Sequence, residues 1–289
     1  MNVHKPLVSL PPIRIHPILW LFAITAIVTG TFMELTIIFS IVVIHELGHY
    51  LAAKSYHWRI RKISLWVFGG VMETEEHGSR PIEQELWVTV AGPLQHIWIY
   101  GVIWLMTYLG WWSSSIVEMA LQYNTSILLF NLLPIWPLDG GKVLQLLSST
   151  LKPYRTAQSI TIVCSVIICL LVSLTFMFFD TLPLSTVMLV VFILLENRLE
   201  WKQRNYLLFR FLLKRYSEKP TLSKTSPILV QSYDSMFQIL KQFRRNRHHH
   251  IFIKDGKESM WVDEDTCLDA YFAFKQHQAK AKDLVRLAE

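Results

Sequence analysis

The chain is 289 residues long, and 52% of its residues are hydrophobic whereas only 17% are charged. A soluble domain usually carries about one quarter charged residues, so this composition excludes an ordinary soluble protein and predicts one that resides in a lipid bilayer. The net charge of +6 is explained below by the loops that flank the membrane, and we expect no direct contact with nucleic acid.

Six apolar runs are candidates for membrane spans, which need about 20 predominantly apolar residues. They are Pro17–Gly30, Leu35–Ala53, Leu86–Leu109, Ile116–Trp136, Ile160–Phe179 and Leu182–Leu195. The first run follows Lys5 and Arg14 as in a signal peptide, but no small-residue cleavage site comes after it. We therefore expect a retained first helix and about six transmembrane helices.

Basic residues predict how these helices are oriented, because lysine and arginine collect in the cytoplasmic loops of membrane proteins. With six spans, the N-terminus, the second and fourth loops and the C-terminus share one side. The basic residues of the short segments fall on this side, among them Lys54, Arg80 and Lys142, and the three loops of the opposite side contain none. Both termini are expected in the cytoplasm.

The composition changes after Glu200. Residues 201–224 carry seven lysines and arginines among leucines and phenylalanines, which is typical of a basic helix at the membrane interface, although a plain linker would also fit. Residues 225–289 read strand, helix, strand, strand, helix, with Asp234 or Ser235 as a helix cap and a hairpin turn at Asp255–Gly256.

The predicted fold is therefore mostly α, with three parts. A six-span transmembrane domain covers residues 1–200, a basic interfacial linker covers residues 201–224, and a small cytosolic α/β domain covers residues 225–289.

Two histidines and a glutamate interrupt the second apolar run, in the motif HELGH from His45 to His49. Residues four apart share one face of a helix, so the two imidazoles point the same way, and Glu46 lies about 100° round from His45. This spacing is that of two zinc ligands with a glutamate as general base, as in metalloproteases. A charged residue inside a bilayer costs about 2.5–3.5 kcal/mol and usually marks function; the alternative is that these residues link helices by hydrogen bonds.

A catalytic zinc site normally takes three protein ligands, and Asp139 is the candidate for the third. It follows Pro134 and Pro137 in the stretch NLLPIWPLDGG, Asn131 to Gly141, at the cytoplasmic end of the fourth span. The prolines should end the regular helix there. A carboxylate at a helix end that pairs only with Lys142 is the alternative.

These residues resemble the site-2 protease family of intramembrane zinc metalloproteases. Other stretches resemble its stage IV sporulation protein FB branch: HPILW at His16–Trp20, FGG at Phe68–Gly70, EEHGSRP at Glu75–Pro81 and AGPLQH at Ala91–His96. The C-terminal domain resembles a CBS domain, so the resemblance extends over essentially the whole chain.

The resemblance implies hydrolysis of a peptide bond in or near the membrane segment of a tethered protein. In this branch the substrate is an inactive sporulation sigma-factor precursor, and membrane-protein inhibitors hold the protease in check in the membrane around the forespore, on the mother-cell side. Carried over, His45, His49 and Asp139 would bind Zn²⁺ and Glu46 would be the general base. Asn131 would bind the substrate backbone or steady the developing oxyanion.

The C-terminal resemblance implies ATP as a ligand of the CBS-type domain. One CBS motif is half of the usual pair, so a homo-oligomer, at least a dimer, is expected from the fold.

The segment KISLWVFGGVMETEE, Lys62 to Glu76, alternates and then turns at Gly69–Gly70. It predicts a hairpin that offers an edge to an extended substrate by strand addition, although a re-entrant loop packed between helices would also fit. Phe68, Gly69 and Gly70 are therefore candidates for substrate binding, together with Asn131 and Pro137. By contrast, we expect His96 to hydrogen-bond a neighbouring helix rather than to bind metal.

Two other classes of function fit parts of the sequence. A metal-ion carrier could use the same three ligands, but it needs ionisable groups along a path to both faces, and the non-cytoplasmic halves of the spans nearly lack them. A non-catalytic scaffold or nucleotide sensor fits the tail but leaves HELGH unexplained.

Overall fold

The computed structural model describes residues 13–15, 17–66, 69–74, 76, 78, 80–179, 183–219, 224–256 and 258–288. The chain forms two compact units. The first consists of residues 1–77 and 83–133, and the second of residues 78–82 and 134–289.

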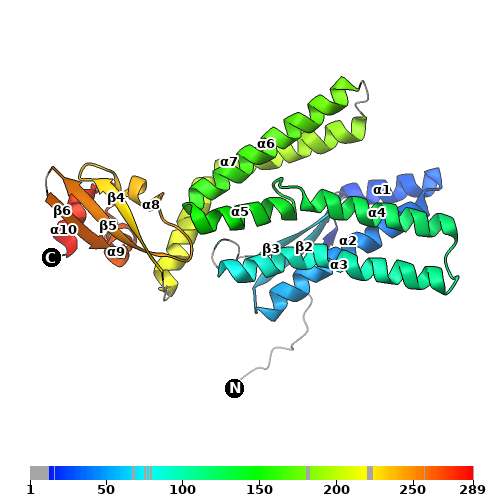
Figure 1. Cartoon of the computed structure of the whole chain (residues 1–289), viewed down its shortest axis with the longest axis horizontal. Coiled ribbons are helices and arrows are strands. Elements are labelled where there is room, and N and C mark those ends of the chain that lie inside the picture. The colour runs from blue at the N-terminus through cyan, green and yellow to red at the C-terminus, as the bar shows by residue number, and fades with distance from the viewer. Residues whose placement is uncertain are drawn as a thin grey trace, which may run out of the picture. The chain divides into compact units, whose positions relative to one another are not determined.

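The first unit, within the described residues, is a group of helices with a small sheet (Figure 1). Its elements are β1 (Ile13–Ile15), α1 (Pro17–Thr29), α2 (Phe32–Ser55), β2 (Ile60–Trp66), β3 (Gly69–Thr74), α3 (Ile82–Tyr108) and α4 (Ser114–Leu132). Ser113 caps α4 by accepting a hydrogen bond from the Ile116 amide. The helix ends where Leu133 is extended, because a residue that precedes proline is pushed out of the helical region. The helix break predicted before Pro134 is therefore confirmed.

The sheet has the order β1-β2-β3, with β1 parallel to β2 and β2 antiparallel to β3. The predicted hairpin is present, but its turn was placed wrongly. Trp66 pairs with Gly69 and Leu65 with Gly70, so both glycines belong to β3. Phe68 lies outside the described residues. Since β3 ends the sheet, it presents an edge.

The second unit contains three further long helices and the C-terminal domain (Figure 1). The helices are α5 (Asp139–Leu151), α6 (Tyr154–Phe178) and α7 (Leu184–Glu218). The domain comprises β4 (Thr225–Gln231), α8 (Met236–Leu240), β5 (His248–Asp255), β6 (Glu258–Asp263), α9 (Glu264–Phe272) and α10 (Ala281–Ala288). The predicted order of strand, helix, strand, strand, helix is confirmed, and Ser235 caps α8 through a capping box.

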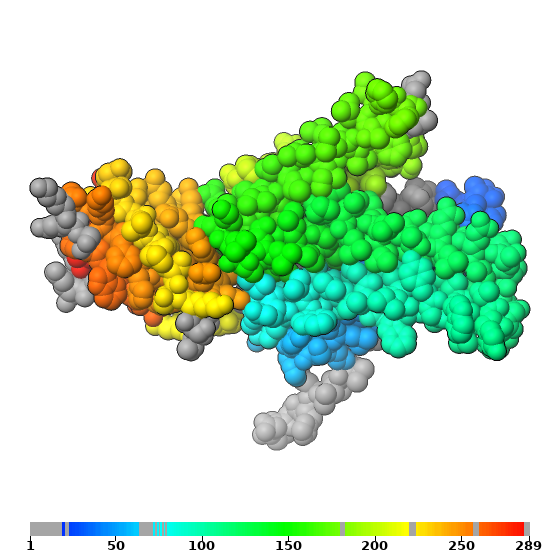
Figure 2. Space-filling model, in the orientation of Figure 1, coloured from blue at the N-terminus to red at the C-terminus, as the bar shows by residue number. Residues whose placement is uncertain are grey.

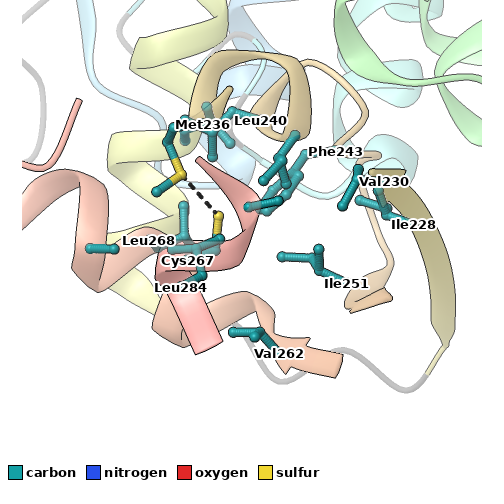
Figure 3. Close-up of a cluster of buried hydrophobic side chains, with 14 of the residues drawn as sticks. Ile228, Val230, Met236, Leu240, Phe243, Ile251, Val262, Cys267, Leu268 and Leu284 are labelled. Atoms are coloured by element: carbon teal, nitrogen blue, oxygen red, sulfur yellow. Dashed lines mark hydrogen bonds between the residues drawn. The ribbon is translucent and has the colours of Figure 1, made fainter. Parts of the chain in front are cut away.

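Alternate side chains of β4 pack into the core of the C-terminal domain. Every second side chain of this strand is buried, beginning with Ser226, as expected for a sheet with one covered face. Figure 3 shows the buried cluster, in which the Cys267 thiol lies 3.4 Å from the Met236 sulfur. Leu208 and Leu212 of α7 belong to the same cluster. Residues 201–218, expected as an interfacial linker, therefore continue α7 and pack into the domain.

In the part of the chain that the structure describes, three helices are long and apolar enough to cross a membrane, judged by length and composition: α2, α3 and α6. The protein is thus mostly helical and an integral membrane protein. Within the second unit, α6 and the N-terminal part of α7 (bright green in Figure 2) carry many exposed apolar side chains. Such a surface is unusual in water and suits contact with lipid.

Candidate metal centre

Helix α2 brings the HELGH residues together. His45, Glu46 and His49 are all buried, and the two imidazole rings lie edge to face with their centroids 4.8 Å apart. The Nε2 atoms of His45 and His49 are 3.1 Å apart. Two nitrogens bound to one tetrahedral zinc at about 2.0–2.1 Å would lie about 3.3–3.4 Å apart. The predicted pairing of the two histidines is therefore present, at a spacing that fits one metal ion.

A hydrogen bond fixes the protonation of the His49 ring. Its Nδ1 lies 2.7 Å from the backbone carbonyl oxygen of Val88, in α3. A carbonyl can only accept, so Nδ1 carries a hydrogen, and in the neutral ring Nε2 then carries a lone pair. This is the usual arrangement of a metal-binding histidine, whose other nitrogen donates to a backbone carbonyl or a carboxylate.

Helix α3 passes very close to the two histidines at Gly92. A Cβ atom at this position would lie 2.2 Å from His49 Nε2 and 2.8 Å from His45 Nε2. On the facing helix α2, a Cβ on Gly48, the residue before His49, would lie 2.4 Å from the Ala91 carbonyl oxygen. Any side chain at Gly92 would therefore displace the ligand nitrogens, and Gly48 allows α2 and α3 to approach one another.

Asp139 is the first residue of α5 and is buried. The partial positive charge of a helix N-terminus favours a carboxylate there, and Lys142 Nζ lies 3.1 Å from Asp139 Oδ1. Among the residues that the structure describes, His45, His49 and Asp139 each offer one ligand atom, and the three atoms lie within 4.8 Å of one another. Two imidazole nitrogens and one carboxylate oxygen are a donor set of catalytic zinc sites, so the residues fit this metal.

The loop that precedes Asp139 is held by two buried polar residues of the second unit. The Trp136 amide donates a hydrogen bond of 2.7 Å to Ser165 Oγ of α6. The Trp136 carbonyl accepts one of 2.8 Å from Asn197 Nδ2 of α7. Because prolines flank Trp136, helical hydrogen bonding is interrupted here, and α6 and α7 supply the missing partners. The loop that carries Asp139 is thereby held through both backbone polar groups of Trp136.

The predicted substrate-binding residues are placed as follows. Asn131 lies in the last turn of α4, and its amide donates a hydrogen bond of 3.0 Å to the Ile127 carbonyl of the same helix. Pro137 follows Trp136 in a cis peptide bond. Gly69 and Gly70 begin the edge strand β3, and β3 packs against α2.

Several residues around the centre were not assigned to it from the sequence. They are Gly92, Ser165, Asn197 and Asn124, and the contact between His96 and His45 was not predicted either. His96 does hydrogen-bond a neighbouring helix, as expected, through Asn124 of α4, but it also contacts His45. The stretch AGPLQH, in which a glycine and a histidine interrupt an apolar helix, was the available signal.

The chain is similar to several known proteins. Residues 33–113 and 108–174 match the family model of peptidase family M50. Over 275 residues the chain is 40% identical to stage IV sporulation protein FB of Bacillus subtilis, which covers 94% of this chain and 96% of the relative. It is 36% identical over 129 residues to a zinc metalloprotease of Methanocaldococcus jannaschii, which covers 43% of this chain and 37% of that protein.

A solved structure is similar as well. The site-2 protease from Methanocaldococcus jannaschii superposes with a TM-score of 0.52 at 25% sequence identity, covering 69% of this chain and 94% of the other. A buried HExxH motif on an apolar helix and this fold define a metallopeptidase embedded in the membrane. The chain belongs to peptidase family M50, the site-2 proteases, and is an intramembrane metalloprotease.

Proposed function

We propose that the protein is a zinc protease that cleaves a membrane-tethered sporulation sigma-factor precursor in or near the membrane, with His45, His49 and Asp139 as zinc ligands. The observation that carries the metal site is the group of three buried donor atoms within 4.8 Å of one another. The relatives named as zinc metalloprotease and sporulation protein support the metal and a role in sporulation.

In this mechanism Glu46 is the general base. When bound, zinc supplies Lewis-acid polarisation of the scissile carbonyl and lowers the pKa of water toward about 7. Glu46 accepts a proton from the attacking water and then delivers it to the leaving amide nitrogen. Glu46 is buried on the same helix as the two histidines. Asn131 is proposed to stabilise the developing oxyanion or to bind the substrate backbone.

The test is co-expression of the chain with a sigma-factor precursor, followed by immunoblotting of the product and metal analysis of the purified protease. Glu46→Gln should keep zinc and the fold but abolish cleavage. Glu34→Gln is a matched control, because Glu34 lies in the first turn of the same helix. This variant should still cleave the precursor. Unchanged cleavage by Glu46→Gln would exclude the mechanism.

We propose that an extended substrate adds to β3 as a further strand. The support is that β3 lies at the edge of its sheet and against α2, the helix that carries Glu46. Phe68, Gly69 and Gly70 would then contact the substrate together with Pro137. A photo-crosslinking residue at Met72 of β3 should capture the precursor, whereas the same residue at the exposed Tyr108 of α3 should not. Equal capture at both positions would contradict strand addition.

The topology is proposed to be six spans with both termini in the cytoplasm, in the membrane around the forespore on the mother-cell side, where membrane-protein inhibitors would restrain the enzyme. The support is the distribution of lysine and arginine and the resemblance to the sporulation branch. The remaining predicted spans correspond to α1, α4 and the N-terminal part of α7. Reporter fusions at each end of the chain would test this topology.

We also propose that residues 225–289 act as a CBS-type regulatory domain that binds ATP and pairs with a second copy. One face of its sheet carries Leu229, Phe252 and Trp261 in a single row across the three strands, and these side chains are 78%, 37% and 60% exposed. A second copy would cover this row. Leu229→Asp should lower the oligomeric mass in detergent, and equilibrium binding of labelled ATP to the full chain tests the nucleotide.

A further inference from the structure

His96 and Asn124 form a chain of hydrogen bonds that ends on His45. His96 lies in α3 and Asn124 in α4, and both side chains are 0% exposed. His45 Nδ1 lies 3.1 Å from His96 Nε2, and His96 Nδ1 lies 2.7 Å from Asn124 Oδ1. Three helices therefore meet through three consecutive polar side chains inside the first unit.

The side-chain amide of Asn124 has one defined orientation in this series of hydrogen bonds. Asn124 Nδ2 donates a hydrogen bond of 3.4 Å to the backbone carbonyl of His96. Because a carbonyl can only accept, the amide nitrogen faces the carbonyl and Oδ1 faces the His96 ring. Oδ1 also can only accept, so His96 Nδ1 carries a hydrogen. In a neutral imidazole the other nitrogen, His96 Nε2, then carries a lone pair.

The donor and acceptor roles of Asn124 and His96 determine those of His45. The lone pair on His96 Nε2 accepts the hydrogen of His45 Nδ1, which leaves a lone pair on His45 Nε2. His49 Nε2 carries a lone pair for the independent reason that its Nδ1 donates to Val88. Two lone pairs that face each other across 3.1 Å repel, and a cation between the two nitrogens turns this repulsion into attraction.

We propose that His96 and Asn124 are positioning residues that hold His45 in the tautomer and ring orientation needed to bind the metal. This inference rests on the proposed role of His45 as a metal ligand. Neither residue belongs to the group of three proposed ligands, and both act through His45. Their effect is to keep Nδ1 of His45 occupied as a donor, so that Nε2 is directed at the metal in every molecule.

Metal affinity of the purified full-length protein tests the proposal. His96→Leu should lower zinc affinity about 10- to 100-fold, the usual effect of losing a hydrogen-bond partner behind a metal ligand. His96→Gln should restore most of it, because the Gln oxygen can accept from His45 while its amide donates to Asn124. Tyr100→Phe is the matched control, since Tyr100 hydrogen-bonds Thr125 between the same two helices at 2.8 Å; its zinc affinity should stay within about twofold of the wild type.

Two further measurements keep the test independent of activity and of folding. The d–d absorption of the cobalt-substituted protein should change in His96→Leu and be unchanged in Tyr100→Phe. If His96→Leu does not fold, ¹⁵N NMR of the imidazoles in the wild type reports the tautomer directly, and His96 with its hydrogen on Nε2 would overturn the inference.

The outcomes separate this inference from the proposed function. Zinc affinity and cobalt spectrum unchanged in folded His96→Leu would overturn the role of His96 while leaving the metal site intact. A wild-type protein that binds no zinc would instead refute the metal site itself.

Discussion

Replacement of Gly92 by alanine tests whether the close approach of α3 shapes the metal centre. The contact of the new Cβ with His49 Nε2 must open from 2.2 Å to at least 3.0 Å, because shorter contacts essentially never occur. Metal–ligand distances tolerate deviations of about 0.2 Å. A shift of this size therefore removes His49 as a ligand, and zinc affinity should fall by more than about 100-fold, beyond the loss of an outer hydrogen bond.

The assay is chelator competition for zinc on the protein purified in detergent, together with cleavage of the co-expressed precursor. Gly101→Ala is the matched control, since Gly101 lies on the same helix and a Cβ there would meet nothing within 4 Å. Alanine stabilises a helix by about 1 kcal/mol relative to glycine. This gain is the same in both variants, so it cannot cause a difference between their zinc affinities. Equal zinc affinity of the two variants would refute the steric argument.

Three further predictions concern the second unit. Ser165→Ala leaves the Trp136 amide without its acceptor on α6, at a cost of about 1–3 kcal/mol, and should lower zinc affinity. Ser173→Ala, which loses only a bond within α6, should bind zinc normally, and equal affinities would contradict this. Glu264→Gln leaves the buried Arg215 guanidinium without its charge partner and should destabilise the C-terminal domain by about 3–5 kcal/mol, seen as faster thiol labelling of Cys267; unchanged labelling would contradict it. Burial lowers the pKa of His249, so the unfolded domain binds more protons and stability should fall as the pH drops below about 6.5. The rate of Cys267 labelling, divided at each pH by that of a free thiol, measures this stability. A normalised rate that does not depend on pH would refute the prediction.

The ligand motifs were predictable because their information is local. HELGH has helical spacing in an apolar run, and the prolines before Asp139 indicate a break in a span. The topology of the C-terminal domain followed from alternation and turn residues in the same way. The turn between β2 and β3 was misplaced because a glycine pair is a general turn signal, whereas the register of the hairpin is set by pairing along both strands.

The residues behind the ligands could not be placed from the sequence, for a physical reason. His96 lies 51 residues from His45 and 28 residues from Asn124, so no periodicity connects them. Each taken alone is a buried polar residue of a membrane helix, and such residues commonly link helices by hydrogen bonds. Only the packing of α2, α3 and α4 shows that these bonds have a direction, from donor to acceptor, toward the metal centre.

This direction explains how a membrane helix accommodates HELGH. A buried polar group is costly unless each of its atoms finds a partner, and the Nδ1 atoms of His45 and His49 have partners on α3. The two Nε2 atoms face each other with lone pairs, an arrangement that the packing of α3 imposes and that a cation stabilises. Gly92 leaves the space for this approach. The hydrogen bonds of the helix bundle therefore satisfy the outer side of each imidazole and leave its inner side suited to a metal ion.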